Sequence, residues 1–358
     1  MKGKEKDMKK MKKLLVFGLS LVMALTFFTA CGGSGGSGDS DADTDQTYNL
    51  RLGTIVNEEH TLTLSAQRYA DAVKEATDGH VNITVYPSSQ LGDYINVYDE
   101  LSMGSIDLAW QTIPDTYDKR NNLGMTPYLV TDYDGIRELY GNKDSWFFKT
   151  LAEVNAEKGV TLLGIAPNGF MGVGAEKLGN LDTVFDFNTP QDALIRSASI
   201  DTLIAQVETM GYRVTTIAYA DLYSSLQTGV ADGWYGGSAI SNIQGFKDVI
   251  KYFVDYKSVN EPMGMLMSTK TLESLPQEYQ DIMIDLAVEE NAKVIDDVEK
   301  ADGEALKALE EYGIEIIEPT DEQLDEMASI MREKVYPLFA EDFGEDLMNE
   351  INNWVESH

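Results

Sequence analysis

Short apolar segments alternate with amphipathic helical patterns through most of this 358-residue chain, and this alternation limits the possible folds more than any other feature. Residues 62–76 show a helical pattern with Ala66, Tyr69, Ala70 and Val73 on one face. Strand-like runs precede and follow this helix, which is the pattern of a strand-helix-strand unit. The alternation therefore predicts an α/β fold. The predicted strands are residues 49–55, 81–86, 106–110, 160–165, 193–197, 213–217, 231–234 and 264–268.

The length of the chain beyond its N-terminal segments, about 310 residues, exceeds one typical domain, so we expect two lobes. The strand and helix pattern restarts near Pro167 and again near Val259, which predicts that the chain crosses between the lobes at these places. The predicted N-terminal lobe is residues 47–167 plus about 259–300, and the predicted C-terminal lobe is residues 168–258 plus about 301–358.

A helical pattern runs from a capping box at Ser274 to Tyr312. One helix of that extent would be about 55 Å long, which is too long for one small lobe. Two interpretations are open, one long helix bent at Gly303 or two helices broken at that glycine. Thr320 to Gln323 predict a further capped helix, and Tyr336-Pro337 begin the last amphipathic segment.

The first 30 residues have the layout of a secretory signal peptide. A lysine-rich opening precedes an apolar run over residues 14–28, and Thr29-Ala30-Cys31 follow. Cys31 is the only cysteine of the chain, and with Gly32 and Gly33 it resembles a bacterial lipoprotein site at which the thiol is acylated before cleavage. The alternative is an unmodified cysteine in a signal peptide or membrane helix, for which the run is short, since a span needs about 20 residues. Residues 31–46 then read as a flexible Gly/Ser/Asp tether.

The charge balance excludes one class of partner. The chain carries 28 basic and 60 acidic residues, a formal net charge of −32 at pH 7, and this excludes nucleic acid as a ligand. An anionic solute must then be captured by local positive groups. The histidines (His60, His80 and His358) have no spacing that suits zinc, and the acidic tether lacks the glycine and glutamate of a calcium loop. We expect no metal and no cofactor.

Residues 193–237 carry the candidate ligand chemistry. Arg196 lies in an apolar strand-like run, so its charge needs an anionic or carbonyl partner, and its planar guanidinium suits a carboxylate. A helical pattern ends at Gly229, and a short strand then places Trp234 and Tyr235 before a glycine turn, where ligand sites are often built. The alternatives are that Arg196 is half of a structural ion pair and that the two aromatic residues belong to the core.

Six motifs follow one another in a characteristic order and spacing from about Tyr48 to the C-terminus. They are Thr77-Asp78-Gly79-His80-Val81, Tyr86-Pro87-Ser88-Ser89-Gln90-Leu91-Gly92, Gly104-Ser105-Ile106-Asp107, Ile195-Arg196, Tyr219-Ala220-Asp221-Leu222-Tyr223 and Leu226-Gln227-Thr228-Gly229-Val230-Ala231-Asp232-Gly233. Together they resemble the extracytoplasmic solute-binding proteins of TRAP transporters, the DctP family. The resemblance implies a two-lobed fold of the periplasmic-binding-protein type, type II-like, with a long helix that spans both lobes. It also implies capture of a small carboxylate-bearing solute between closing lobes and delivery to the TRAP membrane permease.

The resemblance further implies the residues of the site. Arg196 is expected to anchor the solute carboxylate. The other expected contacts are Trp234, Tyr219 and Trp110 around the solute body, and the polar residues Asn57, Glu58, His60, Gln111 and Asn168.

Two departures from the family pattern affect the ligand. Met171 stands where family members commonly carry a second arginine, and Gly236 stands where a polar residue is usual. We therefore expect a pocket that is more aromatic and less cationic than that of a sugar-acid or dicarboxylate binder, holding an organic anion or a zwitterion.

Other function classes have less support. No G-x-S-x-G elbow lies between a predicted strand and helix, and the single cysteine is the first residue of the tether. A pair of carboxylates is still a possible glycosidase site in an exported enzyme. A binding protein of an ATP-driven transporter would share the lobe closure. We expect a monomer without enzymatic activity, held outside the cytoplasm at the cell membrane by a lipid on Cys31.

Overall fold

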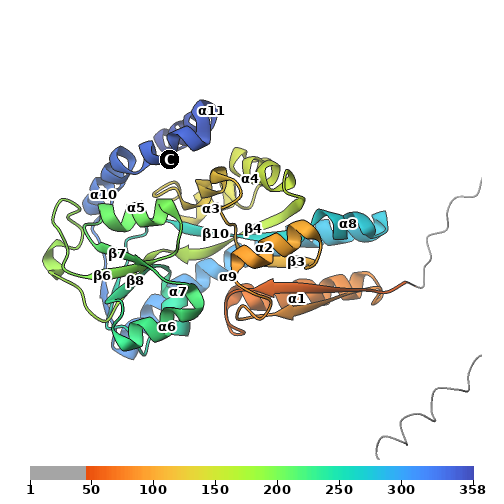
Figure 1. The fold of residues 1–358 in the computed structure, drawn as a ribbon, viewed down its shortest axis with the longest axis horizontal. Helices are drawn as coiled ribbons and strands as arrows, with labels where there is room; N and C mark the ends of the chain where they lie inside the picture. The colour runs from red at the N-terminus through yellow and green to blue at the C-terminus, as the bar shows by residue number, and fades with distance from the viewer. Residues whose placement is uncertain (1–45) are drawn as a thin grey trace, which may run out of the picture. The chain divides into compact units, whose positions relative to one another are not determined.

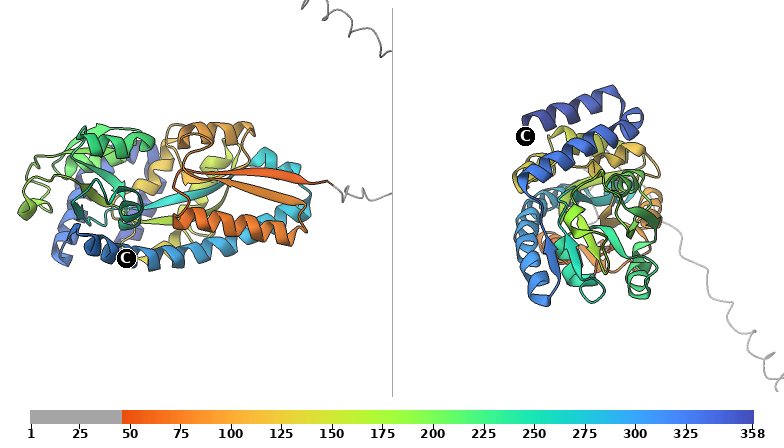
Figure 2. Two further views of the ribbon diagram at one scale, coloured as in Figure 1. Left: turned by 90° about the horizontal axis from the view of Figure 1, so that it is seen from below. Right: turned by 90° about the vertical axis from the view of Figure 1, so that its left-hand side faces the viewer.

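The computed structural model describes residues 46–358, so the predicted signal peptide and Cys31 lie outside the described residues. Two β-sheets are flanked by helices, and one long helix, α9 (Gln277–Tyr312), runs past both sheets (Figures 1 and 2). This arrangement confirms the predicted two-lobed α/β fold with a helix that spans both lobes.

The first sheet contains β1 (Tyr48–Thr54), β2 (Val81–Tyr86), β3 (Leu108–Thr112), β4 (Val160–Phe170) and β10 (Asn260–Ser268). Their order is β2-β1-β3-β10-β4, with β1 parallel to β2 and β3, and β10 antiparallel to β3 and β4. Helix α1 (Thr61–Ala76) links β1 to β2 and buries the apolar face that its sequence predicts. Helix α2 (Tyr94–Met103) links β2 to β3. The predicted strand-helix-strand unit is therefore confirmed.

The second sheet contains β5 (Gly172–Ala175), β6 (Leu194–Ser197), β7 (Arg213–Thr216), β8 (Gly233–Gly237), β9 (Tyr252–Val254) and β11 (Glu315–Ile317). Their order is β11-β9-β5-β8-β6-β7. Helices α5 (Asp201–Thr209) and α6 (Tyr219–Thr228) follow β6 and β7. Gly229 ends α6 in the left-handed region, with φ of 74°, which favours glycine.

The chain crosses between the two sheets three times, once through α9 and twice at adjacent short crossings. One short crossing, at Met171, joins β4 to β5, and the other, through residues 255–259, joins β9 to β10. The Met171 backbone N–H donates to the Val259 carbonyl at 2.7 Å, so the crossings are hydrogen-bonded to each other. A Cβ at Gly172 would lie 2.3 Å from the Val254 carbonyl oxygen, and this close approach requires glycine. The predicted lobe boundaries remain a prediction.

Helix α9 runs unbroken for 36 residues, which corresponds to about 54 Å at the usual rise. It packs against α1 and β4 beside the first sheet, and against β11 and the π-helical turn η3 (Asn242–Phe246) beside the second. The alternative of two helices broken at Gly303 is therefore wrong. The predicted capping box is also wrong, because Ser274 ends the short helix α8 (Thr269–Ser274) and α9 begins after Pro276 without a side-chain cap.

The remaining helices cover the sheets and their loops. They are η1 (Lys119–Met125), α3 (Tyr133–Leu139), α4 (Trp146–Ala156), η2 (Leu181–Thr183), α7 (Ala239–Ser241), α10 (Asp321–Lys334) and α11 (Tyr336–Ser357). Helix α10 begins with the predicted capping box of Thr320 and Gln323. Helix α11 is fixed by hydrogen bonds from Tyr336 to the Pro127 carbonyl at 2.9 Å and from Trp354 to the Leu129 carbonyl at 2.8 Å.

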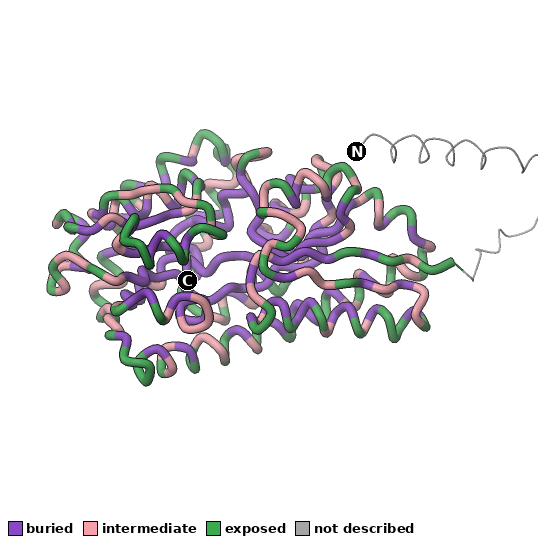
Figure 3. Tube along the Cα trace, turned by 60° about the horizontal axis from the view of Figure 1, so that its bottom comes forward, coloured by how far each residue is buried: buried purple, intermediate pink, exposed green. Residues whose placement is uncertain are grey.

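Most strand residues of both sheets are buried (Figure 3).

Candidate functional site

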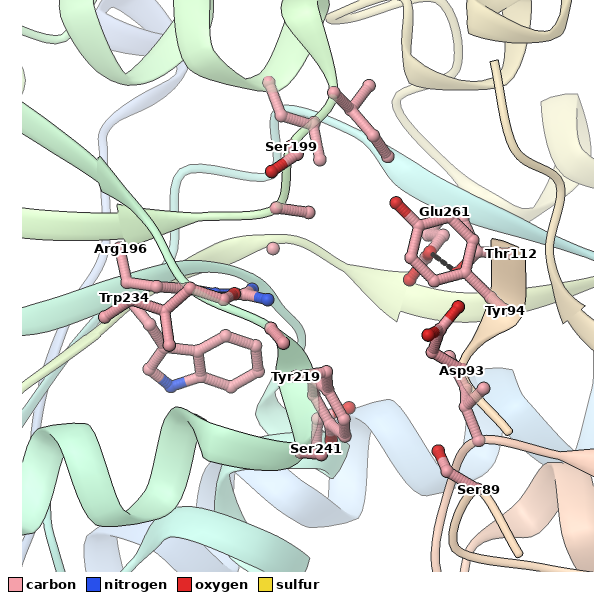
Figure 4. Close-up of a pocket in the computed structure, with 18 of the residues that line it drawn as sticks. Ser89, Asp93, Tyr94, Thr112, Arg196, Ser199, Tyr219, Trp234, Ser241 and Glu261 are labelled. Atoms are coloured by element: carbon pink, nitrogen blue, oxygen red, sulfur yellow. Dashed lines mark hydrogen bonds between the residues drawn. The ribbon is translucent and has the colours of Figure 1, made fainter. Parts of the chain in front are cut away.

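A cavity of about 490 Å³ is lined by residues of both sheets. Its walls come from the loops after β1 and β2, the start of α2, the ends of β3, β4 and β6, the start of α6, and residues of β8 and β10. Carboxyl ends of β-strands commonly form ligand sites in α/β folds. Figure 4 shows the side chains that face this space.

Arg196 is the only basic residue among the described residues that line the cavity. It lies on β6, is 4% exposed, and donates from Nε to the Ile217 carbonyl at 2.8 Å. Within residues 46–358 no carboxylate forms an ion pair with it, and Figure 4 shows its guanidinium directed into the cavity. Burial lowers the pKa of Arg196 to about 10, so the group still carries its charge at neutral pH. A buried cation with open donors is suited to a carboxylate.

Two predicted aromatic residues lie beside Arg196 and differ in their surroundings. Tyr219, the first residue of α6, is partly exposed and lines the cavity. Trp234 also lines the cavity but is 1% exposed, and its Nε1 donates to Asn242 Oδ1 at 3.0 Å. Their ring centroids are 6.2 Å apart in an edge-on arrangement. Tyr219 therefore offers the accessible aromatic surface, and Trp234 supports it from the core.

Opposite Arg196 the cavity contains a buried carboxylate, Glu261 of β10 (Figure 4). The Thr112 hydroxyl donates to its Oε1 at 2.6 Å, and Asn168 Nδ2 donates to its Oε2 at 3.0 Å. Burial raises the pKa of Glu261, while the hydrogen bonds from Thr112 and Asn168 and the charge of Arg196 oppose that rise. Asn168, a predicted site residue, thus lines the cavity and orients the carboxylate.

The sequence prediction missed Glu261. The predicted strand begins at residue 264, whereas β10 begins at Asn260, so Glu261 fell in an assumed loop. A usable signal exists, because Glu261 is the only charged residue between Lys257 and Lys270. An isolated acid in an otherwise uncharged run that forms a buried strand is a candidate functional group.

The other predicted contacts of the N-terminal lobe are not among the residues that line the cavity. His60 caps α1 by accepting from the Leu62 N–H at 3.2 Å, and burial lowers its pKa to about 4. Trp110 is in the core and donates to the Met263 carbonyl at 3.0 Å. Gln111 donates to the Tyr94 carbonyl at 2.7 Å.

Asn57 and Glu58 also lie away from the cavity lining. Asn57 accepts from the Glu59 N–H at 3.1 Å, and Glu58 is exposed. The loop after β1 instead contributes Ile55 and Val56 to the cavity. This wall is therefore more apolar than the predicted contacts imply.

Met171 lines the cavity at the first crossing and is buried. The position that departs from the family pattern is thus a wall residue without charge.

In the described part of the chain no cluster of three or more His, Cys, Asp or Glu side chains is arranged to hold a metal ion. No helix within residues 46–358 is both long enough and apolar enough to span a membrane.

A two-lobed α/β fold with a cavity beside the crossings is the architecture of the periplasmic-binding-protein fold. A family model described as "Bacterial extracellular solute-binding protein, family 7", named DctP, matches residues 52–342. The chain belongs to this family, which is a family of transport proteins that work outside the cytoplasm.

Individual relatives agree with this assignment. The C4-dicarboxylate-binding periplasmic protein DctP of Vibrio cholerae is 24% identical over 316 residues, which are 84% of this chain and 88% of the relative. A TRAP periplasmic solute-binding protein of Desulfovibrio salexigens, solved with orotic acid, superposes with a TM-score of 0.77 at 24% identity, covering 87% and 98% of the two chains. Another from Haemophilus influenzae, solved with L-gulonate, has a TM-score of 0.77 at 20% identity and covers 86% and 100%.

Proposed function

We propose that this protein captures a small carboxylate-bearing solute between two closing lobes and delivers it to the membrane permease of a TRAP transporter. The single observation that carries this proposal is Arg196, a buried guanidinium that faces the cavity without an acidic partner among residues 46–358. An unpaired buried charge is costly, and a ligand carboxylate removes that cost through two parallel hydrogen bonds.

The ligands of similar proteins support an organic acid. Orotic acid and L-gulonate each carry a carboxyl group, and both were bound by proteins with the same fold. In this chain Arg196 supplies the cation, and Tyr219 supplies a flat surface for the body of the solute. We expect binding without chemical turnover, because the family transports solutes.

Lobe closure follows from the position of the cavity. The chain passes between the sheets at Met171 and at residues 255–259, and these crossings lie beside the cavity wall. Short connections absorb the backbone rotation of a hinge while the lobes stay rigid. Closure would then exclude water from the pair formed by Arg196 and the solute carboxylate.

The proposed localisation includes a lipid anchor on Cys31, which lies outside the described residues. One diacylglyceryl group joined to this thiol would bring two acyl chains and stable membrane attachment, whereas a single chain is marginal. Mass spectrometry of the mature N-terminus tests this, and an unmodified Cys31 or cleavage elsewhere would contradict it. We expect the binding protein to act as a monomer.

A thermal-shift screen tests the proposed function. The panel contains monocarboxylates, dicarboxylates, sugar acids and amino acids, each compared with its neutral amide or alcohol. A solute at 100 times its dissociation constant stabilises the protein by about 2.7 kcal/mol, which raises the melting temperature measurably. Solution scattering with the best binder is expected to show a smaller radius of gyration. Stabilisation by neutral analogues equal to that by the acids would overturn carboxylate capture.

A further inference from the structure

Glu261 gives the cavity a second ionisable group, whose carboxylate form is opposite in charge to Arg196. It is 9% exposed, and its hydrogen-bond donors, Thr112 and Asn168, are both neutral. No lysine, arginine or histidine of the described chain forms an ion pair with it. A carboxylate buried without a cation is costly to the fold, so its place in the cavity wall points to a role with a ligand.

The second acid of the cavity, Asp93, does not share these features. It is exposed, and its Oδ1 accepts from the backbone N–H groups of Ile95 and Asn96 at 2.9 and 3.0 Å. Its Oδ2 accepts from the Asn96 side chain at 2.6 Å. Asp93 therefore serves as the N-cap of α2, and Glu261 is the carboxylate that remains for a ligand.

Glu261 can still accept further hydrogen bonds. A carboxylate has about four acceptor positions, two on each oxygen, and the protein fills one on each. An ammonium group brings three donors and a positive charge, so it matches the remaining acceptors. A hydroxyl group brings one donor and no charge.

The structure assigns to this cavity, on the basis of the proposed function, a solute that carries one carboxylate and one ammonium group. Arg196 binds the carboxylate and Glu261 binds the ammonium. A simple monocarboxylate would leave Glu261 desolvated and unpaired, and a dicarboxylate would bring a second negative charge against it. The apolar wall residues Ile55, Val56 and Ile217 suit an uncharged body between or beside the two charged groups.

Calorimetry at neutral pH with two matched pairs of probes tests this assignment. L-leucine is compared with 2-hydroxy-4-methylpentanoate, and 5-aminopentanoate is compared with hexanoate, so that the pairs sample short and long separations of the two charges. In at least one pair the ammonium compound is expected to bind at least about tenfold more tightly than its partner. Glutarate is expected to bind more weakly than either zwitterion.

The variant Glu261→Gln keeps the shape of the side chain and can still accept from Asn168 Nδ2, while its amide NH2 can donate to the Thr112 hydroxyl, which also accepts, so that the charge is removed and both partners are kept. We expect it to abolish the preference for the ammonium compound while it leaves binding of the hydroxy or simple acid within about threefold, which also shows that the variant is folded. Asp93→Asn is the matched control, because asparagine still caps α2, and it should retain the preference.

The outcomes separate this assignment from carboxylate capture. Equal affinity within both pairs, or a preference that survives Glu261→Gln, overturns the assignment and leaves capture by Arg196 standing. If no acid of either pair binds, and succinate and D-glucuronate also fail to bind, both the proposed function and this assignment are overturned.

Discussion

The cavity has two walls that each carry an ionisable group, the arginine wall with Arg196, Tyr219 and Trp234 and the glutamate wall with Glu261, Thr112 and Asn168. The protein holds the two groups in different ways. Among residues 46–358, Arg196 uses Nε alone for a hydrogen bond to the protein, and its guanidinium is directed into the cavity (Figure 4). Glu261 receives a donor on each carboxylate oxygen, from Thr112 and from Asn168. The arginine wall is therefore an open binding group, and the glutamate wall is a fixed one. We infer that Arg196 determines most of the affinity and that Glu261 determines which acids are accepted.

The largest expected effect comes from removing the open group. Arg196→Ala should weaken binding of the best carboxylate from the screen by roughly 2 to 5 kcal/mol, because the carboxylate would be desolvated and unpaired. Arg196→Lys keeps a charge but loses the planar pair of donors, so its affinity should fall between those of the alanine variant and the wild type. Calorimetry measures both losses.

Arg213→Ala is the matched control for this comparison. Arg213 lies on β7, the strand next to β6, but its side chain is 65% exposed and pairs only with exposed Asp192 at 3.7 Å. Such surface pairs contribute little, so affinity should stay near that of the wild type. Near-wild-type binding by a folded Arg196→Ala protein would show that Arg196 is structural.

A second comparison, between the two aromatic residues of the arginine wall, separates affinity from stability. Trp234→Ala removes a buried ring and its hydrogen bond to Asn242, and should lower the free energy of unfolding by about 3 to 5 kcal/mol. Tyr219→Leu should lower affinity by about 1 kcal/mol with little loss of stability, because this side chain is partly exposed. Denaturant unfolding and calorimetry measure both quantities, and equal stability losses would contradict the distinction.

The arginine wall could be predicted from sequence because its signals are local. Arg196 ends an apolar strand, Tyr219 begins a helix, and Trp234 lies in a strand before a glycine turn, so each is marked by its immediate neighbours. The α/β order follows in the same way from local periodicity. Periodicity alone left one long helix and two shorter helices open, and the family resemblance favoured the single helix that the structure contains.

The glutamate wall depends on contacts between distant parts of the chain. Glu261 meets Thr112 and Asn168 only because β10 lies between β3 and β4 in the sheet. Conversely, histidine and tryptophan often contact ligands, but in this structure His60 caps helix α1 and Trp110 packs in the core. The strand pairing decides whether such a residue contacts a ligand or packs in the protein, and a single sequence does not show that pairing.

The last expected effect is on stability alone and concerns a second buried acid, which lies on the crossing that leads to Glu261. Asp255 is 3% exposed, and its carboxylate lies 3.7 Å from Lys257 Nζ. Burial raises the pKa of Asp255 to about 7, with Lys257 opposing the rise and Asp302 adding to it. Burial also raises the pKa of Asp302, to about 6.

The sign of the effect follows from linkage. An aspartate in the unfolded chain has its usual pKa of 3.8, so between that value and about 7 the folded protein binds more protons than the unfolded chain. The free energy of unfolding should therefore fall as pH rises through this window, by at most about 1.4 kcal/mol per pH unit for one group, and should level off above it. Asp255→Asn should make the slope between pH 5 and pH 7 less negative. Asp302 and Glu261, whose pKa values burial also raises, contribute slopes of the same sign, and His60, whose pKa burial lowers to about 4, contributes a slope of the opposite sign. Asp144→Asn, at a side chain that is 90% exposed, should leave the slope unchanged. Urea unfolding of the ligand-free protein across this range measures the slopes. If the free energy of unfolding of Asp255→Asn depends on pH as that of the wild type does, Asp255 is ionised throughout this range. Its ion pair with Lys257 would then be strong enough to offset burial. Glu261 has no such ion pair among the described residues.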